Sequence, residues 1–206
     1  MIRLILGLVF AGVIGAHATT AQSAYVLKAR ADSAKRPWTA ADAHFVSGMI
    51  HHHAQALVMA KWAPSHGASP AIQTLCARII NAQTDEIALM QTWLRDRLQP
   101  VPDATPGPMK MEMGGMTHEM LMPGMLSDVQ LRQLDSTRGE EFDRLFLLYM
   151  IQHHSGAVRM VKELFATPGA GQDEFVFKLA TDINVDQTTE IDRMTRMLAT
   201  FNGKKK

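Results

Sequence analysis

Two segments of the chain carry histidine and methionine at the same spacing. The first, Met49 to Ala60, reads MIHHHAQALVMA, and the second, Met150 to Val161, reads MIQHHSGAVRMV. Thioether sulfur is a soft donor that favours Cu(I), whereas imidazole nitrogen suits Cu(I), Cu(II) and zinc. The pairing of these donors predicts copper binding, with Cu(I) favoured and Cu(II) or Ag(I) as alternatives. The candidate ligands are Met49, His52, His53 and Met59 in the first segment, and Met150, His153, His154 and Met160 in the second.

Helical geometry predicts one common surface for these donors. At about 100° per residue, the two adjacent histidines flank the first methionine of each segment on one face of a helix. His51 points to the opposite face, and the equivalent position in the second segment is Gln152. The matched positions therefore share one stripe, whereas the position that differs faces outward.

The same stripe can also be explained as helix core. Methionines at helical spacing fill a core, and buried histidines need hydrogen-bonding partners, which Gln83, Glu86, Gln187 and Glu190 could supply. If a metal is bound instead, Glu86 and Glu190 could orient the imidazoles, as carboxylates often do for metal-bound histidine. The presence of two copies of the pattern favours metal binding.

A third group of soft donors lies between the two segments. The stretch Met109 to Met125 reads MKMEMGGMTHEMLMPGM, which is too rich in glycine and proline for a stable helix and does not look like a strand. Gly114 and Gly115 read as a turn. We expect a flexible loop that wraps Cu(I) or Ag(I), and the alternative is an adaptable apolar flap. The candidate ligands are Met109, Met111, Met113, Met116, His118, Met120, Met122 and Met125.

The two segments belong to an internal duplication. Met49 aligns with Met150 at an offset of 101 positions (150 − 49). Downstream, QTDEIALM from Gln83 resembles QTTEIDRM from Gln187, at an offset of 104 (187 − 83). A loop absorbs the difference of three residues, so each half is one copy of the same unit.

All four parts of this duplication are expected to be helices, because apolar and small residues recur three and four positions apart. Two helical hairpins joined by a long crossover predict an all-α, ferritin-like four-helix bundle. Capping signals mark the starts of the first three helices: Thr39 with Asp42, Ser69 with Pro70, and Ser127 with Gln130. The expected order is a signal peptide at 1–18, a loose arm at 19–38, a first hairpin at 39–98, a Met-rich crossover at 99–126, a second hairpin at 127–201 and a basic tail at 202–206.

The N-terminal residues indicate where the protein works. Arg3 precedes an apolar run from Leu4 to Ile14, and Ala16-His17-Ala18 resembles a signal-peptide cleavage site. The apolar run is too short to span a membrane. We therefore expect an exported, periplasmic protein whose mature chain is not inserted in the membrane. The single cysteine, Cys76, excludes an internal disulfide and reads as a core residue.

The repeated motifs resemble a known family. Met-Ile-x-His-His followed by Ala and Met, then Gln-x-x-Glu-Ile-x-x-Met, is similar to the exported ferritin-like family catalogued as domain of unknown function 305. The stretches MPGMLSDVQLRQL and FDRLFLLYMIQHHSGAV resemble the lead-in to its second half. The resemblance covers about Ala40 to Leu198 and implies periplasmic copper binding and copper tolerance, with the helical His/Met positions as ligands. The chain departs from the family at His51 and Gln152, where proline is common.

The leading hypothesis is a non-catalytic copper scavenger, store or chaperone, whose partners are metal ions and other periplasmic copper-handling proteins. One alternative is a ferritin-like di-metal oxidoreductase, although that class uses Glu-x-x-His pairs and the sequence contains none. The other alternative is a metal-free helical interaction module. The net charge of +1 predicts no attraction to nucleic acid.

Overall fold

The computed structural model describes residues 28, 37–113 and 115–203, without the side chains of 111–113, 202 and 203. The predicted signal peptide, most of the predicted arm and the end of the basic tail lie outside the described residues. The fold is therefore that of the unit that begins at Pro37. No helix in the described part of the chain is both long enough and apolar enough to span a membrane.

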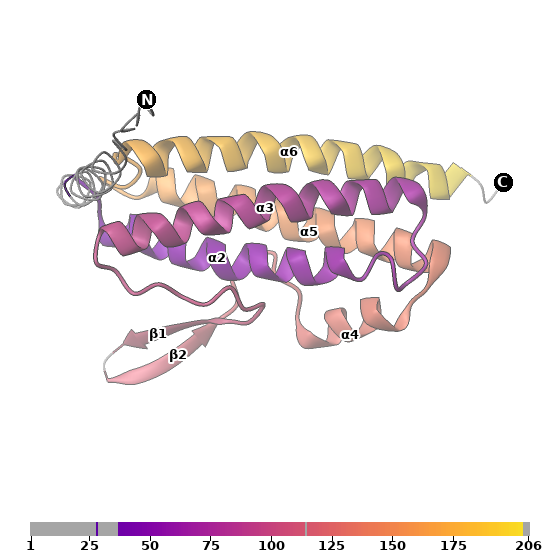
Figure 1. The fold of residues 1–206 in the computed structure, drawn as a ribbon, viewed down its shortest axis with the longest axis horizontal. Coiled ribbons are helices and arrows are strands. Elements are labelled where there is room, and N and C mark those ends of the chain that lie inside the picture. The colour runs from indigo at the N-terminus through magenta and orange to yellow at the C-terminus, as the bar shows by residue number, and fades with distance from the viewer. Residues whose placement is uncertain (1–27, 29–36, 114, 204–206) are drawn as a thin grey trace, which may run out of the picture. The chain divides into compact units, whose positions relative to one another are not determined.

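Four long helices run side by side in this unit (Figure 1). They are α2 (Ala40–Lys61), α3 (Pro70–Asp96), α5 (Gly139–Ala166) and α6 (Glu174–Gly203). Helix α2 packs against α3, α5 packs against α6, and contact between α2 and α5 joins the two hairpins. This arrangement confirms the predicted all-α bundle of two helical hairpins joined by a crossover.

Two equivalent aspartates, one in each hairpin, bond to the loop that connects the helices of the other hairpin. Asp42 and Asp143 are 101 positions apart (143 − 42), the same offset that relates the two histidine segments. Asp42 completes the predicted capping box with Thr39, and its Oδ1 accepts a hydrogen bond from the backbone N–H of Gly171 at 2.7 Å. Both carboxylate oxygens of Asp143 accept the backbone N–H of Ser69 at 3.2 Å. The duplication therefore extends to the contacts that close the two loops.

The third bundle helix does not begin where the capping signal predicted. Ser127 and Gln130 do form a capping box, but it opens a short helix, α4 (Asp128–Ser136). The chain then turns through Gly139, whose φ of +59° is accessible mainly to glycine, and α5 starts there. Only Leu134 of α4 is buried, so this helix contributes little to the core.

The crossover contains a β-hairpin, so the expectation of a flexible loop without strands was wrong. Strands β1 (Met109–Met113) and β2 (Met116–Met120) pair antiparallel (Figure 1). The connection between them is the predicted turn, in which Gly115 has a φ of +78°. Alternation of methionine with polar residues suits a strand with two different faces, and a Gly-Gly pair is a known hairpin signal. Methionine is not a typical strand residue, which is why the pattern was missed.

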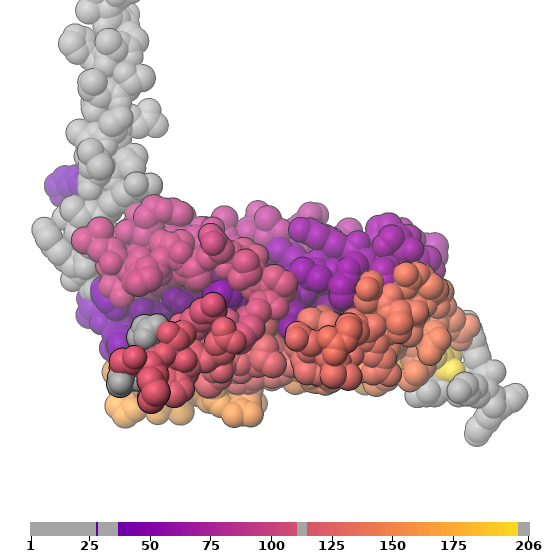
Figure 2. All heavy atoms as spheres, turned by 90° about the horizontal axis from the view of Figure 1, so that it is seen from below, coloured from indigo at the N-terminus to yellow at the C-terminus, as the bar shows by residue number. Residues whose placement is uncertain are grey.

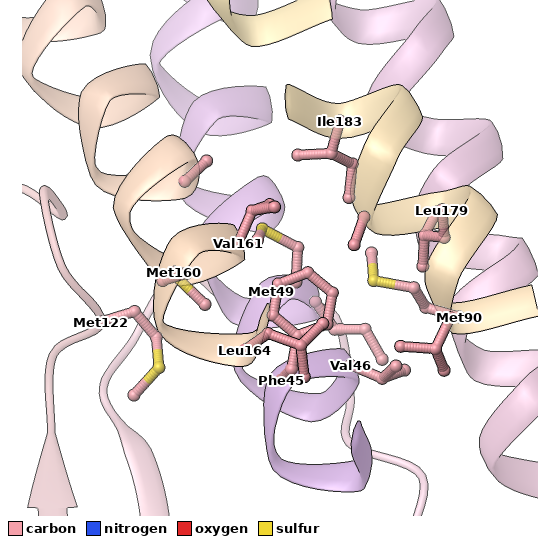
Figure 3. Close-up of a cluster of buried hydrophobic side chains, with 14 of the residues drawn as sticks. Phe45, Val46, Met49, Met90, Met122, Met160, Val161, Leu164, Leu179 and Ile183 are labelled. Carbon is pink, nitrogen blue, oxygen red and sulfur yellow. The ribbon is translucent and has the colours of Figure 1, made fainter. Parts of the chain in front are cut away.

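The core of the bundle consists of two clusters of buried apolar side chains. One cluster contains Met49 and Met160 together with buried methionines of α3 and the crossover. Figure 3 shows part of it, with the sulfurs of Met49, Met90, Met122 and Met160 among aromatic and aliphatic groups. The other cluster contains Met59 and Met150. The candidate methionines of the helices are thus distributed over both clusters.

Candidate metal site

A layer of four buried histidines lies between α2 and α5. His52, His53, His153 and His154, here called the histidine layer, are each 0% exposed. The rings of His52 and His153 are in contact, with their centroids 3.7 Å apart and their planes tilted by 36°. Within each pair of neighbours the centroids are just over 6 Å apart, at 6.3 Å in α2 and 6.1 Å in α5. The predicted stripe therefore faces the bundle interior on both helices, whereas Gln152 is exposed and His51 is only partly buried.

Oxygen acceptors determine which ring nitrogen carries the hydrogen in three of these imidazoles. The Nε2 atom of His52 donates to the carbonyl oxygen of Pro123 at 3.0 Å, because a carbonyl can only accept. His53 and His154 donate from Nε2 to the carboxylates of Glu86 and Glu190, at 2.7 Å and 2.6 Å. In a neutral ring this leaves the lone pair on Nδ1, and none of the three Nδ1 atoms has a hydrogen-bond partner.

His153 differs from the other three because neither of its ring nitrogens has a hydrogen-bond partner. A buried polar group without a partner costs free energy, so such a residue calls for a reason other than stability. Imidazole nitrogens with free lone pairs are the form that binds a metal ion.

Burial favours the neutral form of His52, His153 and His154. It lowers the pKa of His52 and His153 well below the ordinary value, and neighbouring imidazoles lower these pKa values further. Burial also lowers the pKa of His154, and the hydrogen bond to Glu190 opposes that effect. Neutral imidazole does not repel an incoming cation, so the buried rings are suited to coordinate one.

The candidate methionines of the helices lie at different distances from the histidine layer. Met49 and Met59 lie on one stripe of α2, but ten residues (59 − 49) separate them by about 15 Å along the helix, too far for one ion. The structure instead places Met49 in one core cluster with Met160, and Met59 in the other with Met150. Along the helices, Met49 and Met150 lie one turn before the histidines, whereas Met59 and Met160 lie about 10 Å beyond His52 and His153.

Of the side chains expected beside the histidines, the two glutamates make hydrogen bonds to imidazoles, and no such bond involves the oxygens of the two glutamines. Glu86 and Glu190 hold His53 and His154 as described. The buried side chain of Gln83 has no hydrogen-bond partner for either its nitrogen or its oxygen, and the Oε1 atom of Gln187 has none either. Neither glutamine therefore positions an imidazole through its side-chain oxygen.

The end of the crossover is seated directly over the layer. The carbonyl oxygen of Pro123 holds His52, and the Gln55 side chain makes two hydrogen bonds to the backbone of Leu126, at 3.0 Å and 2.7 Å. Gly156 of α5 allows the close approach, since a Cβ there would lie only 1.9 Å from the Pro123 oxygen. No sequence signal pointed to this contact, because its acceptor is a backbone carbonyl from a distant part of the chain.

The candidate ligands of the crossover fall into different environments. Met109, Met122 and Met125 are buried in the core. Met116 and Met120 are 64% and 42% exposed, and His118 is exposed as well. The side chains of Met111 and Met113 lie outside the described residues. The three buried methionines pack in the core and the two exposed ones contact solvent, so the crossover methionines are not equivalent as candidate ligands.

The register of the hairpin pairs donor residues across the two strands. The partners are Met109 with Met120, Met111 with His118, and Met113 with Met116. Cross-strand partners share a face of a sheet, and alternate positions along a strand share it as well. The described donors Met109, Met116, His118 and Met120 therefore share one face of the ribbon, and Lys110, Thr117 and Glu119 take the other face.

Side chains other than methionine do not complete a metal site by themselves. The described residues contain no group of three or more His, Cys, Asp or Glu side chains placed to hold an ion. Cys76 is buried in the second core cluster, as the sequence predicted, and burial raises the pKa of its thiol to about 12. The soft donors nearest to the histidines along their own helices are Met49 and Met150, three residues before His52 and His153.

Comparison with known proteins agrees with this architecture. A crystal structure of a DUF305 fragment from Deinococcus radiodurans superposes with a TM-score of 0.64 and 31% identity, over 80% of this chain and 99% of that one. CopM in its Cu(I)-bound form gives 0.59 and 28%, over 80% and 99%. A DUF305 protein of Streptomyces coelicolor, provisionally described as secreted, gives 0.63 and 28%, over 78% and 93%.

Structures of CopM with Cu(II) and with silver match as well, at 30% and 29% identity and a TM-score of 0.58 each. Among curated sequences, the uncharacterized protein L153 of Acanthamoeba polyphaga mimivirus is 38% identical over 56 residues, 27% of this chain. The chain spans only about a third (37%) of the length of that relative. Residues 42–198 match the family described as Domain of unknown function (DUF305), and the chain belongs to this family.

Proposed function

We propose that this protein is an exported, periplasmic copper-binding protein that sequesters or passes on copper without catalysing a reaction. The similarity to CopM structures that contain Cu(I), Cu(II) or silver supports a copper-related role. The signal-peptide pattern at residues 1–18 and the similarity to a protein described as secreted support export. Its partners would be copper ions and periplasmic copper-handling proteins.

The observation that carries the proposal is the state of the buried imidazoles. Oxygen acceptors hold the Nε2–H groups of His52, His53 and His154, while their Nδ1 atoms remain without partners. A hydrogen bond from the far nitrogen to an oxygen is the arrangement that orients metal-bound histidine and raises its basicity. Most buried polar atoms in native proteins have a hydrogen-bond partner, so unpartnered nitrogens on four neighbouring histidines call for an explanation, and metal binding supplies one.

The donor set favours Cu(I). The buried imidazoles are donors that suit copper, and the thioethers of Met49 and Met150, one helical turn before them, are soft donors that favour Cu(I). A monovalent cation is less costly to bury among neutral ligands than a divalent one. Cu(I) and Ag(I) are therefore the expected cargo of the histidine layer, and Glu86 and Glu190 offset the charge of the ion through the imidazoles.

Substitution of His153 tests this proposal. His153→Leu removes a ring that makes no hydrogen bond, so the bundle should remain folded while the Cu(I) affinity falls at least tenfold. The matched control is His51→Gln, which gives the outer position of α2 the residue found at the equivalent position of α5. Affinity is measured without oxygen against a competing Cu(I) chelator. If both variants bind Cu(I) as tightly as the unaltered protein, the histidine layer does not bind the ion.

The β-hairpin is proposed to capture the ion first. Its pairs of donor positions extend along one face of a ribbon whose second strand is exposed. A combined Met116→Leu and His118→Gln variant changes two exposed residues, so it should slow the uptake of Cu(I) and leave the unfolding transition unchanged. A Lys110→Gln and Thr117→Val variant changes the other face and serves as control. Uptake at the original rate in both variants would exclude the hairpin.

A further inference from the structure

A hollow of about 410 Å³ lies between α2, α5 and the crossover. Three methionines and one histidine line it: Met120 and Met122 from the crossover, Met160 from α5 and His44 from α2. Met122 and Met160 are 4% and 6% exposed, whereas Met120 is 42% exposed and His44 is exposed. The hollow thus has two buried thioethers at its inner end and two further soft donors toward the solvent. Figure 2 shows the crossover spread over this side of the bundle.

The inner end of the hollow is shaped by Gly48. A Cβ atom at this position would lie 2.6 Å from the sulfur of Met122 and 3.5 Å from the terminal methyl of Met160. The absence of a side chain therefore lets the two thioethers meet against the backbone of α2. Figure 3 shows Met122, from the crossover, near Met160 of α5. His44 is one helical turn before Gly48 and lies on the same face of α2.

The duplication shows that this hollow is specific to one side of the molecule. At the offset of 101 positions, the equivalents of His44 and Gly48 in the second half are Leu145 and Tyr149. Neither residue offers a soft donor or space for a crossover side chain. Helix packing alone therefore does not explain His44 and Gly48, because the second half packs with larger apolar and aromatic residues at the equivalent positions.

The hollow is separate from the histidine layer. Met160 is seven residues beyond His153 on α5, and His44 is eight residues before His52 on α2. These spacings correspond to about 10 and 12 Å along the helices, more than the diameter of one coordination sphere. An ion in the hollow would therefore be a second ion.

The surroundings are suited to a soft cation. The remaining wall is mainly apolar and includes Phe45 and Leu164. The charged groups at the hollow are Arg159 and Glu163, which pair at 2.7 Å and so neutralise each other. Three sulfurs and one imidazole form a donor set typical of Cu(I) sites.

We propose that Met120, Met122, Met160 and His44 form a second soft-metal site, for Cu(I) or Ag(I), in which the crossover supplies two of the ligands. This inference rests on the proposed copper-binding function and adds a site on one side of the bundle. The site lies where the donor face of the hairpin reaches the helices, since Met120 is the last residue of β2 and lines the hollow.

Titration of the mature protein with Ag(I) tests the site directly. Ag(I) is diamagnetic and does not oxidise methionine, so the methyl signals of ¹³C-labelled methionine can be followed by NMR and assigned with single Met→Leu variants. The methyl signals of Met120 and Met122 and the ring signals of His44 are expected to shift together. If signals near the histidine layer shift and these do not, the second site is refuted and the proposed function survives. If no signal shifts, both fail.

Two matched variants provide an independent measurement. Met122→Leu with His44→Gln removes one buried and one exposed ligand of the hollow, and it should lower the Ag(I) stoichiometry by one equivalent. Met90→Leu with His51→Gln makes the same types of change at a buried methionine of α3 and an α2 histidine, neither of which lines the hollow or is a proposed ligand. Equal stoichiometry of the two variants would overturn the site. Urea unfolding of both variants verifies that each remains folded.

Discussion

The Nε2 atom of His52 lies 3.0 Å from the carbonyl oxygen of Pro123, so the crossover is attached to a side chain of the buried histidine layer. The contact requires the backbone of the crossover to lie on α5 at Gly156. It links the position of the crossover to the orientation of one of the proposed ligands. Substitutions that lift the crossover should therefore affect both stability and copper binding.

Gly156→Ala tests this link. The new Cβ would lie 1.9 Å from the Pro123 oxygen and 2.6 Å from the Gly124 Cα, so the backbone must shift. We expect a loss of about 2 kcal/mol in the free energy of unfolding, as for other overpacked positions, together with weaker Cu(I) binding. Urea denaturation and chelator competition measure the two effects. Gly107→Ala is the control, because nothing lies within 4 Å of its Cβ position, and an equal loss there would contradict the explanation.

Removal of a carboxylate behind an imidazole should weaken metal binding without removing a ligand. Glu86→Gln and Glu190→Gln replace the acceptors of His53 and His154 with a neutral amide. The Cu(I) affinity should fall about 10–100-fold for each variant. Glu141→Gln, an exposed position in the first turn of α5, should change it little. An unchanged affinity in both test variants would show that these glutamates do not act on the metal.

A buried ion pair fastens the end of α3 to the start of α6. Arg97 bonds to Asp173 at 2.5 Å, and Asp173 also accepts hydrogen bonds from the Trp93 indole and the backbone of Val176. Asp173→Asn leaves the arginine charge buried, so we expect a loss of about 3 kcal/mol in the free energy of unfolding.

Denaturant titration measures this loss, and Asp182→Asn is its control. Asp182 pairs with Lys178 on the exposed face of α6, where an ion pair contributes less than about 1 kcal/mol. Similar losses in the two variants would show that burial does not strengthen the Arg97–Asp173 pair.

The thiol of Cys76 should be inert in the folded protein. It is 2% exposed, and burial together with the nearby Asp143 carboxylate raises its pKa to about 12. Because the thiolate is the reactive form, iodoacetamide at neutral pH should modify Cys76 only after denaturation. Mass spectrometry with and without urea measures the modification. Rapid labelling of the folded protein would contradict the buried position.

Local signals in the sequence predicted most of the fold. The capping boxes at Thr39 and Ser127 are present because such boxes depend only on residues three positions apart. The helix after Ser127 was nevertheless assigned to the bundle, because the break before Gly139 has no proline and only one glycine. The hairpin was missed because its strands are built from methionine, which has no strong preference for strands.

The site was predictable in its residue types and only partly in its geometry. Periodicity identified the face of α2 and α5 that carries the histidines, and the similarity of the two halves identified Glu86 and Glu190. Periodicity could not show that Met49 and Met160 belong to the same core cluster, because the grouping depends on how the two helices cross. The Pro123 carbonyl and the hollow beside Gly48 were likewise invisible, since both depend on where the crossover comes to rest.

The contact between His52 and His153 joins equivalent positions of the two halves, so the pseudo-two-fold axis of the bundle passes between their rings. This rotation exchanges the pair of Met49 and Met160 with that of Met150 and Met59. Such an isologous arrangement is the one that a symmetric homodimer uses. Two copies of one such hairpin would bring the same histidine positions together, whereas the hollow beside Gly48 requires the two different halves and the segment that connects them.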